Sequence, residues 1–246
     1  MKSGDVTIVL STLALVAAVV LDLSTPTPAL AEEQGGKIKT LLLVGGEIHD
    51  WKGIGNVVEE FLKKTDKFDI TRVNNDLDAL KADRIEPFDL VIFYWTVGKI
   101  TDEQRNGLLN HIAKGKGFVT FHSGADSFRD DATWKKFVGG YFTTHPHYRT
   151  YQVSVTENDS PITKGITEFM ITDEQYILNY DAAAITVLAN SLWKGKLMPV
   201  LWTKSWEKGR VFYSALGHDP KACQQPMFQK LLIRGALWAA GREVGD

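Results

Sequence analysis

Histidines are concentrated where the chain is expected to leave its strands. Five of the six histidines end apolar runs typical of strands or lie in the loops beyond them: His49, His122, His145, His147 and His218. Imidazole titrates near neutral pH and binds transition metals, so a cluster of such side chains could supply an acid, a base or metal ligands. The sixth, His111, lies within a predicted helix and is expected to be a surface or packing residue.

Carboxylates and aromatic residues accompany these histidines. They are Asp50, Trp51, Glu174, Tyr176 and Asp219. Carboxylates beside aromatic rings suit a sugar, which offers apolar ring faces and hydroxyl edges. A single loop histidine often only hydrogen-bonds a backbone carbonyl, and Asp173, which precedes Glu174, could simply cap a turn. The functional interpretation therefore depends on whether these strand ends meet in one crevice.

One turn resembles a device that activates nucleophiles, but it carries a histidine. In residues 121–125 a predicted strand leads directly into a sharp turn, as at a nucleophile elbow, and His122 stands where Cys or Ser is expected. Ser123 lacks the flanking glycines of that motif. Cys223 is the only cysteine, so it cannot form an internal disulfide and is expected to be a small buried hydrophobe. A hydrolase that uses Ser123 or Cys223 stays open as a minor alternative.

No sequence motif for a known cofactor is present. The glycines at positions 45, 46, 53 and 55 do not have the spacing of a dinucleotide fingerprint, and no P-loop lysine follows them. No HExxH pair occurs either. A divalent metal, held by scattered histidines and a carboxylate, is the one cofactor that these residues allow. The pattern does not specify which metal.

The first half of the chain alternates between predicted strands and helices. Strands are expected at residues 38–44, 68–73, 88–95 and 117–121, with helical patterns near 57–64 and 101–115. Continuous apolar runs are typical of strands covered on both faces, as in a parallel sheet. Helices between strands favour βαβ units. Because ligands bind beyond the carboxyl ends of such strands, the working surface is expected there.

The rhythm changes from about residue 151. Shorter strands are expected at residues 151–156, 168–178, 185–189, 199–203 and 210–215, without intervening helices. They predict an antiparallel extension of the sheet, closed by a helix over residues 228–240. The expected fold is therefore a single α/β domain over residues 32–246, with a mostly parallel sheet flanked by helices and an antiparallel part in the C-terminal half.

The first 31 residues are typical of a signal peptide. Lys2 precedes an apolar run over residues 6–21, and Ala29-Leu30-Ala31 supplies the small-x-small pattern that signal peptidase cleaves. An uncleaved membrane anchor is the alternative, but the apolar run is shorter than the roughly 20 residues that span a bilayer. The mature protein is expected to be secreted or periplasmic, with no membrane association after cleavage. A formal net charge of −2 without a basic run excludes the electrostatic footprint of a nucleic-acid-binding protein.

Several segments, taken in order, resemble the trehalose-utilisation (ThuA-like) family over about residues 38–241. They are Gly45-Gly46 with His49-Asp50, residues 117–126, residues 139–146, Asp173-Glu174-Gln175-Tyr176, residues 199–202, residues 209–219 and residues 238–241. The resemblance implies a flavodoxin-like α/β fold related to class I glutamine amidotransferases. Those enzymes carry a Cys at the elbow and a His-x-Glu pair near the C-terminus. This chain has His122 and only His218-Asp219 there, so glutamine amidotransferase activity is not expected.

The resemblance links the chain to sugar catabolism, alongside oxidoreductases that make 3-keto-sugars. We therefore expect an enzyme that acts on a carbohydrate or a 3-keto-glycoside by acid–base chemistry, with or without a metal. His122 or Glu174 is expected as the base, and His49 and His218 as polarising groups or metal ligands. Residues expected to bind the substrate are Asp50, Trp51, His145, Tyr176 and Asp219. The alternative is a non-catalytic carbohydrate-binding protein that uses the same crevice, and neither hypothesis favours a particular oligomeric state.

Overall fold

The computed structural model describes Met1 and residues 36–245. The predicted signal peptide, residues 1–31, lies outside the described residues apart from Met1. Among the described residues, no helix combines the length and the apolar character that a membrane span requires.

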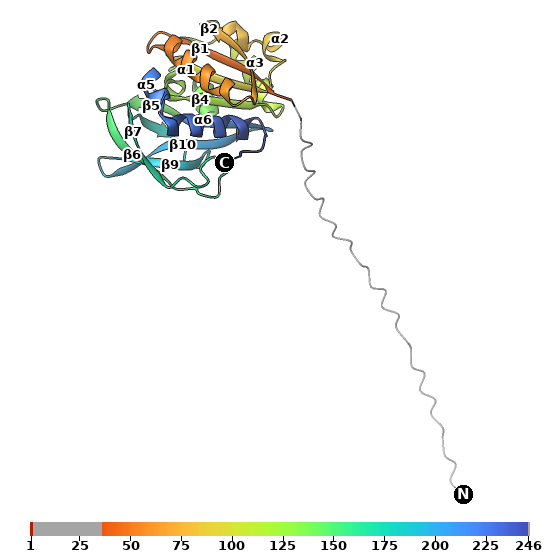
Figure 1. Ribbon diagram of the computed structural model, residues 1–246. Helices are drawn as coiled ribbons and strands as arrows, with labels where there is room; N and C mark the ends of the chain where they lie inside the picture. Colours follow the sequence, from red (N-terminus) through yellow and green to blue (C-terminus); the bar gives the residue numbers. More distant parts are fainter. Residues whose placement is uncertain (2–35, 246) are drawn as a thin grey trace. The chain divides into compact units, whose positions relative to one another are not determined.

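A nine-stranded mixed sheet forms the centre of the domain, with the strand order β2-β1-β3-β4-β11-β10-β9-β6-β7 (Figure 1). The parallel half consists of β1 (Ile38–Gly46), β2 (Phe68–Asn74), β3 (Leu90–Thr96), β4 (Gly117–Phe121) and β11 (Gly209–Ser214). The antiparallel half consists of β10 (Lys196–Trp206), β9 (Thr186–Trp193), β6 (Arg149–Val155) and β7 (Glu168–Asp173). The predicted α/β class, with its parallel part and antiparallel extension, is confirmed.

Helices cover both faces of the parallel strands, which explains why every residue of β3 and β4 is buried. Phe228 of α6 (Pro226–Ala239) contacts both Phe61 of α1 (Trp51–Lys64) and Phe121 of β4, with ring centroids 6.3 and 5.6 Å apart. Phe118 points to the opposite face of β4 and packs against Phe137 of α4 (Ala132–Val138) at 4.8 Å. Burial of each such ring contributes roughly 1.5–3 kcal/mol.

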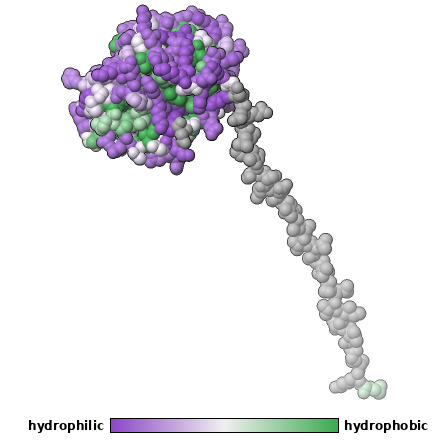
Figure 2. All heavy atoms as spheres, in the orientation of Figure 1, coloured by the Kyte–Doolittle hydropathy of each residue, from purple (hydrophilic) through white to green (hydrophobic). Residues whose placement is uncertain are grey.

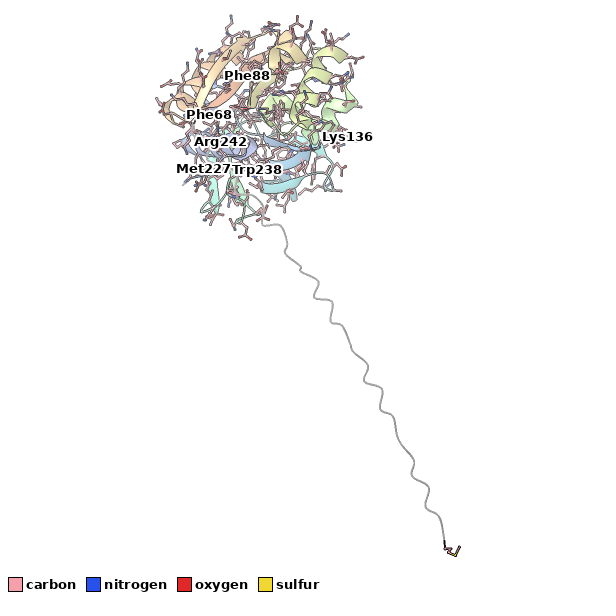
Figure 3. The ribbon with its side chains drawn as sticks, turned by 90° about the vertical axis from the view of Figure 1, so that its right-hand side faces the viewer. Phe68, Phe88, Lys136, Met227, Trp238 and Arg242 are labelled. Carbon is pink, nitrogen blue, oxygen red and sulfur yellow. The ribbon has the colours of Figure 1, made fainter. Side chains whose placement is uncertain are left out.

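Local signals set where the helices begin. Thr101 and Gln104 form a capping box at the start of α3 (Asp102–Ala113). Helix α6 begins at Pro226, and Met227 and Trp238 mark its two ends in Figure 3. The short helices are η1 (Leu77–Leu80), α2 (Ala82–Ile85), η2 (His122–Asp126) and α5 (Pro220–Cys223).

The strand directions bring distant parts of the chain to one edge of the sheet. From β11 onward each pairing is antiparallel, so β9 and β7 run in the same direction as β1, β3, β4 and β11. Strand β7, at the far end of the sheet, lies next to the segment that follows α5. The Gln225 side chain forms two hydrogen bonds with the backbone of Thr172 in β7, of 3.1 and 2.7 Å. The carboxyl ends of β1, β4, β11 and β7 therefore lie close together.

Two of the predicted elements differ in the structure. The strand expected over residues 168–178 is two strands, β7 and β8 (Ile177–Tyr180), separated by Glu174–Tyr176. Strand β8 pairs with β5 (Gly140–Thr144), in a segment that was expected to be a loop, and the two form a separate sheet. The pairing of Tyr141 with Asn179 joins segments far apart in sequence, so no local pattern announces it.

Polar side chains cover most of the face that Figure 2 shows. Among the described residues, exposed large apolar side chains include Met170, Leu192 and Leu197, which lie on β7, β9 and β10.

Candidate metal centre

Three histidines and one glutamate meet at the carboxyl edge of the sheet. One ligand atom from each of His49, His122, Glu174 and His218 lies within 4.8 Å of the others. Each residue follows a different strand, namely β1, β4, β7 and β11. This group, called the histidine–glutamate cluster below, unites the four side chains that the sequence proposed as catalytic.

His122 occupies the elbow between β4 and η2 in a left-handed conformation, with φ of 42°. A non-glycine residue held there costs on the order of 1–3 kcal/mol, so its surroundings must fix it. The Nδ1 atom lies 3.1 Å from the Ala215 carbonyl, and Tyr213 donates a hydrogen bond of 3.0 Å to the His122 carbonyl. Because a carbonyl only accepts, Nδ1 carries the proton and Nε2 faces the cluster with a lone pair.

His49 lies beyond β1, also with a positive φ, of 70°. Its Nδ1 atom is 2.8 Å from the hydroxyl oxygen of Thr96, the last residue of β3. Strands β1 and β3 flank the point where the sheet order reverses, the usual ligand position in open α/β sheets. Burial, then repulsion from a charged His122 or His218, lowers the pKa of His49 to about 3, so the ring is neutral.

Glu174 and His218 form a charge-stabilised pair. The Glu174 Oε2 atom lies 3.2 Å from Nδ1 of His218 and 3.4 Å from Nε2 of His122. Burial opposes ionisation of Glu174, but the close approach of the His122 and His218 imidazoles outweighs it and lowers the carboxyl pKa. Burial likewise opposes protonation of His218, and the hydrogen bond to Glu174 outweighs it and raises the pKa of the imidazole.

A single proton occupies the middle of the cluster in this arrangement. Nδ1 of His218 lies 3.2 Å from both Nε2 of His122 and Oε2 of Glu174, and both of these atoms can accept. The proton on Nδ1 therefore bridges them. Metal binding requires such ligands to lose their protons, so a cation would take the place of this one.

The four donors fit a divalent transition metal. Three imidazole nitrogens and one carboxylate oxygen form a donor set used for zinc and for its neighbours in the first transition row. The outer nitrogen of His122 bonds a backbone carbonyl, and that of His49 contacts a hydroxyl, as the second nitrogen of a metal-binding histidine commonly does. The structure thus offers both ligands and the groups that orient them.

His145 and Tyr176 line the cluster in different ways. The Tyr176 ring is buried and stacks on His122 with centroids 3.8 Å apart, so it supports the imidazole from behind. His145 lies at the rim with 41% of its side chain exposed, and its Nδ1 atom is 3.0 Å from Oε1 of Glu174. Tyr148, also at the rim and 38% exposed, has its ring 5.7 Å from that of His218.

The remaining predicted substrate residues have structural contacts of their own. Asp50 accepts a hydrogen bond from the Gly53 backbone and caps α1, and Asp219 accepts one from the Ala222 backbone and caps α5. Trp51 is the first residue of α1 and packs, half-buried, against the core. Both aspartates therefore have a structural role that accounts for their carboxylates.

The candidate nucleophiles are both buried. Ser123 is fully buried, and burial raises the pKa of the Cys223 thiol well above its ordinary value, which suits a packing residue. His111 is buried, with its Nε2 atom 2.9 Å from the Phe88 carbonyl, whereas His147 is exposed.

Two residues that the sequence reasoning missed orient the cluster. Thr96 contacts His49, and Asp173 bonds the backbone on either side of the site. Thr96 directly follows the predicted strand at residues 88–95, so the strand-end rule that singled out the histidines would have found it if applied to hydroxyl groups. Asp173 lies within the strand predicted over residues 168–178 and was considered only as a turn cap, because the break after β7 was not predicted.

The trehalose-utilisation (ThuA) family matches residues 39–239 of the chain, and this family lies within the glutamine amidotransferase-like superfamily. A search of curated proteins gave no match. A ThuA-like protein from Parabacteroides merdae is 22% identical, with a TM-score of 0.78 over 85% of this chain and 92% of that one. Another, from Bacteroides uniformis, is 20% identical, with a TM-score of 0.69 over 87% and 95% of the two chains. At these identities the structural likeness establishes the fold.

Proposed function

The chain belongs to the trehalose-utilisation (ThuA) family, and from that premise we propose that it is a metal-dependent enzyme acting on a carbohydrate or 3-keto-glycoside. One observation carries the proposal: the ligand atoms of three histidines and a glutamate, from four separate strand ends, lie within 4.8 Å of one another. Ordinary packing does not require such a convergence at the ligand-binding edge of an α/β sheet.

The side chains divide into holding and reacting groups by their exposure. His122 is fully buried between Tyr176 and the Ala215 carbonyl, which supports a role as ligand rather than base. Glu174 turns Oε2 to the histidines and Oε1 to His145 at the rim. This division supports Glu174 as the base, with His145 exchanging the proton with solvent.

A 3-keto-sugar suits these groups chemically. A bound divalent ion supplies Lewis acidity, which stabilises negative charge on a carbonyl oxygen. The C–H bond beside a ketone is acidic, so Glu174 could remove that proton and set up isomerisation or elimination of the glycosidic partner. Tyr148 offers aromatic surface near the rim for the apolar face of a sugar ring.

We also propose that the protein acts outside the cytoplasm as a small-molecule enzyme. The support is the signal-peptide pattern that ends at Ala31, a few residues before β1 begins at Ile38. Cleavage there would leave all elements of the described domain intact.

Metal analysis of the purified protein tests the proposal directly. Near-stoichiometric metal is expected in the wild type and should be lost in His122→Ala and His218→Ala. His147→Ala is the matched control, because this exposed imidazole lies only two residues from His145 and outside the cluster. Absence of metal from the wild type, even after incubation with zinc, manganese or cobalt, would refute the metal-dependent mechanism.

Turnover of a 3-keto-glycoside separates the enzyme from its alternative. Glu174→Gln should abolish product formation while the protein still folds. If the wild type instead binds the sugar saturably and forms no product after long incubation, the carbohydrate-binding alternative replaces the enzyme.

A further inference from the structure

Asp173 is a fully buried carboxylate that joins two segments of the cluster. Its Oδ1 atom accepts hydrogen bonds from the backbone N–H groups of Glu174, at 2.8 Å, and His218, at 3.2 Å. Its Oδ2 atom accepts a third, from Gly217 at 2.7 Å. Asp173 ends β7, whereas Gly217 and His218 belong to the connection after β11.

No strand pairing sets the separation of these two segments. Strands β10, β9 and β6 lie between β11 and β7 in the sheet order. The two hydrogen bonds that Asp173 accepts from Gly217 and His218 therefore help to set the registration that a backbone ladder would otherwise give. The Asp173 carboxylate thus contacts the backbone of Glu174 and His218, the residues whose side chains form the charged pair of the cluster.

The loop that receives these bonds is itself constrained. Gly217 adopts φ of 101°, and a Cβ atom there would lie 2.7 Å from the Phe228 ring. Tyr94 in addition donates a hydrogen bond of 3.3 Å to the His218 carbonyl. The loop that Asp173 binds therefore has little freedom to adapt. Because the loop cannot follow, loss of the Asp173 carboxylate would displace Glu174 relative to His218.

Stability alone gives a poor account of a carboxyl group at this position, because burial disfavours its charged form and raises its pKa. Burying a carboxylate costs several kcal/mol, and among the described residues no Lys or Arg side chain pairs with Asp173. Its compensation comes from the three N–H groups and the neighbouring imidazoles. We propose, resting on the proposed function, that Asp173 is a positioning residue that holds Glu174 and His218 at metal-binding distance through their backbone.

The test compares Asp173→Asn with Asp131→Asn. Asp131 is a matched control because its carboxylate also accepts a backbone N–H, from Trp134, and bonds Arg105, but it lies outside the cluster. Affinity for cobalt is measured by titration of the metal-free proteins, together with the cobalt absorption spectrum and the melting temperature. D173N should bind cobalt at least about 10-fold more weakly, with an altered spectrum. D131N should keep the wild-type affinity and spectrum, even at an equal loss of melting temperature.

Hydrogen exchange of the metal-free proteins gives a readout that does not depend on metal. In the wild type, the amides of Gly217 and His218 should exchange as slowly as those of β11, and in D173N they should exchange faster. If the wild type binds cobalt and D173N binds it equally well, the positioning role is wrong while the metal site stands. If the wild type binds no metal, the proposed function fails and the exchange rates decide the positioning role. Fast exchange of both amides in the wild type overturns it even if D173N does not fold.

Discussion

Two carboxylates beside the cluster differ from Glu174 in what they bind. Asp50 and Asp219 each satisfy a backbone N–H at the start of a helix, and in Asp219-Pro220 the cap precedes a proline at the first helical position. This cap-and-proline pattern is legible in the sequence, although proximity to His218 had suggested a substrate contact. The cap accounts for one oxygen of each carboxylate without any substrate.

Asp219→Ala is therefore expected to act on stability. Loss of the cap should lower the free energy of unfolding by about 0.5–2 kcal/mol, with sugar affinity retained. Urea denaturation and a sugar titration measure the two effects, with Asp50→Ala as the parallel case on α1. Unchanged stability combined with lost sugar binding would contradict the cap assignment.

We expect His111, which lies outside the cluster, to make the free energy of unfolding depend on pH. Burial, followed by the positive charges of Lys116 and Lys114, lowers its pKa, despite the opposing bond to Phe88. The unfolded chain therefore takes up a proton near pH 6.5 that the folded chain resists. The stabilising effect of the neutral ring is present above that pH and is lost as the pH falls.

The measurement is urea unfolding of the metal-free protein at pH 7 and pH 5. His111→Gln keeps a side chain that can donate to the Phe88 carbonyl but does not titrate, so it should lose less stability over this interval than the wild type. An equal loss in both proteins would show that His111 does not contribute.

At the scale of elements, the elbow depends on one glycine. A Cβ atom on Gly124 would lie 1.8 Å from Oγ1 of Thr120, which donates a hydrogen bond to the Phe93 carbonyl. Substitution would force η2 away from β4 and move His122 with it.

Gly124→Ala should lower the free energy of unfolding by about 1–3 kcal/mol. It should also weaken metal binding about 10-fold or more, because the ligand is displaced. Gly165→Ala is the control: its φ of 75° strains an alanine, but no atom lies within 4 Å of the added Cβ, so this variant tests backbone strain without a steric clash. Calorimetric titration with zinc and chemical denaturation measure both variants. Equal zinc affinity in the two variants would contradict the link between the elbow and the site.

The elements show how far sequence reasoning reached. Continuous apolar runs such as β3 identify the parallel strands, and the rule for carboxyl ends then places His49, His122 and His218 at one edge. Glu174 could not be placed in this way, because β7 lies at the far end of the sheet order. Glu174 reaches the cluster through two tertiary contacts, that of β7 with the segment after α5 and that of Asp173 with the loop after β11.

For the whole molecule, the cluster brings together segments that follow four different strands. A ligand that binds only the folded state adds stability according to its concentration, about 2.7 kcal/mol at 100 times its dissociation constant. Saturating zinc or manganese should therefore raise the melting temperature of the chelator-treated wild type. His218→Ala should lose this shift and His147→Ala should keep it. Scanning calorimetry measures these melting temperatures. An increase in His218→Ala equal to that of the wild type would show that the ion binds elsewhere.

The order of the four ligands along the chain has a consequence for biosynthesis. His49 emerges early in synthesis and His218 close to the end, with Glu174 and His122 between them. No two of them are near neighbours in sequence, so a nascent or unfolded chain offers only single imidazoles with weak affinity. Under the proposed function, all four ligands could hold the ion only after β11 has inserted beside β4, so loading would be a late event. The identity of the ion would then depend on the metals available where folding is completed, and not on those available where the chain is synthesised.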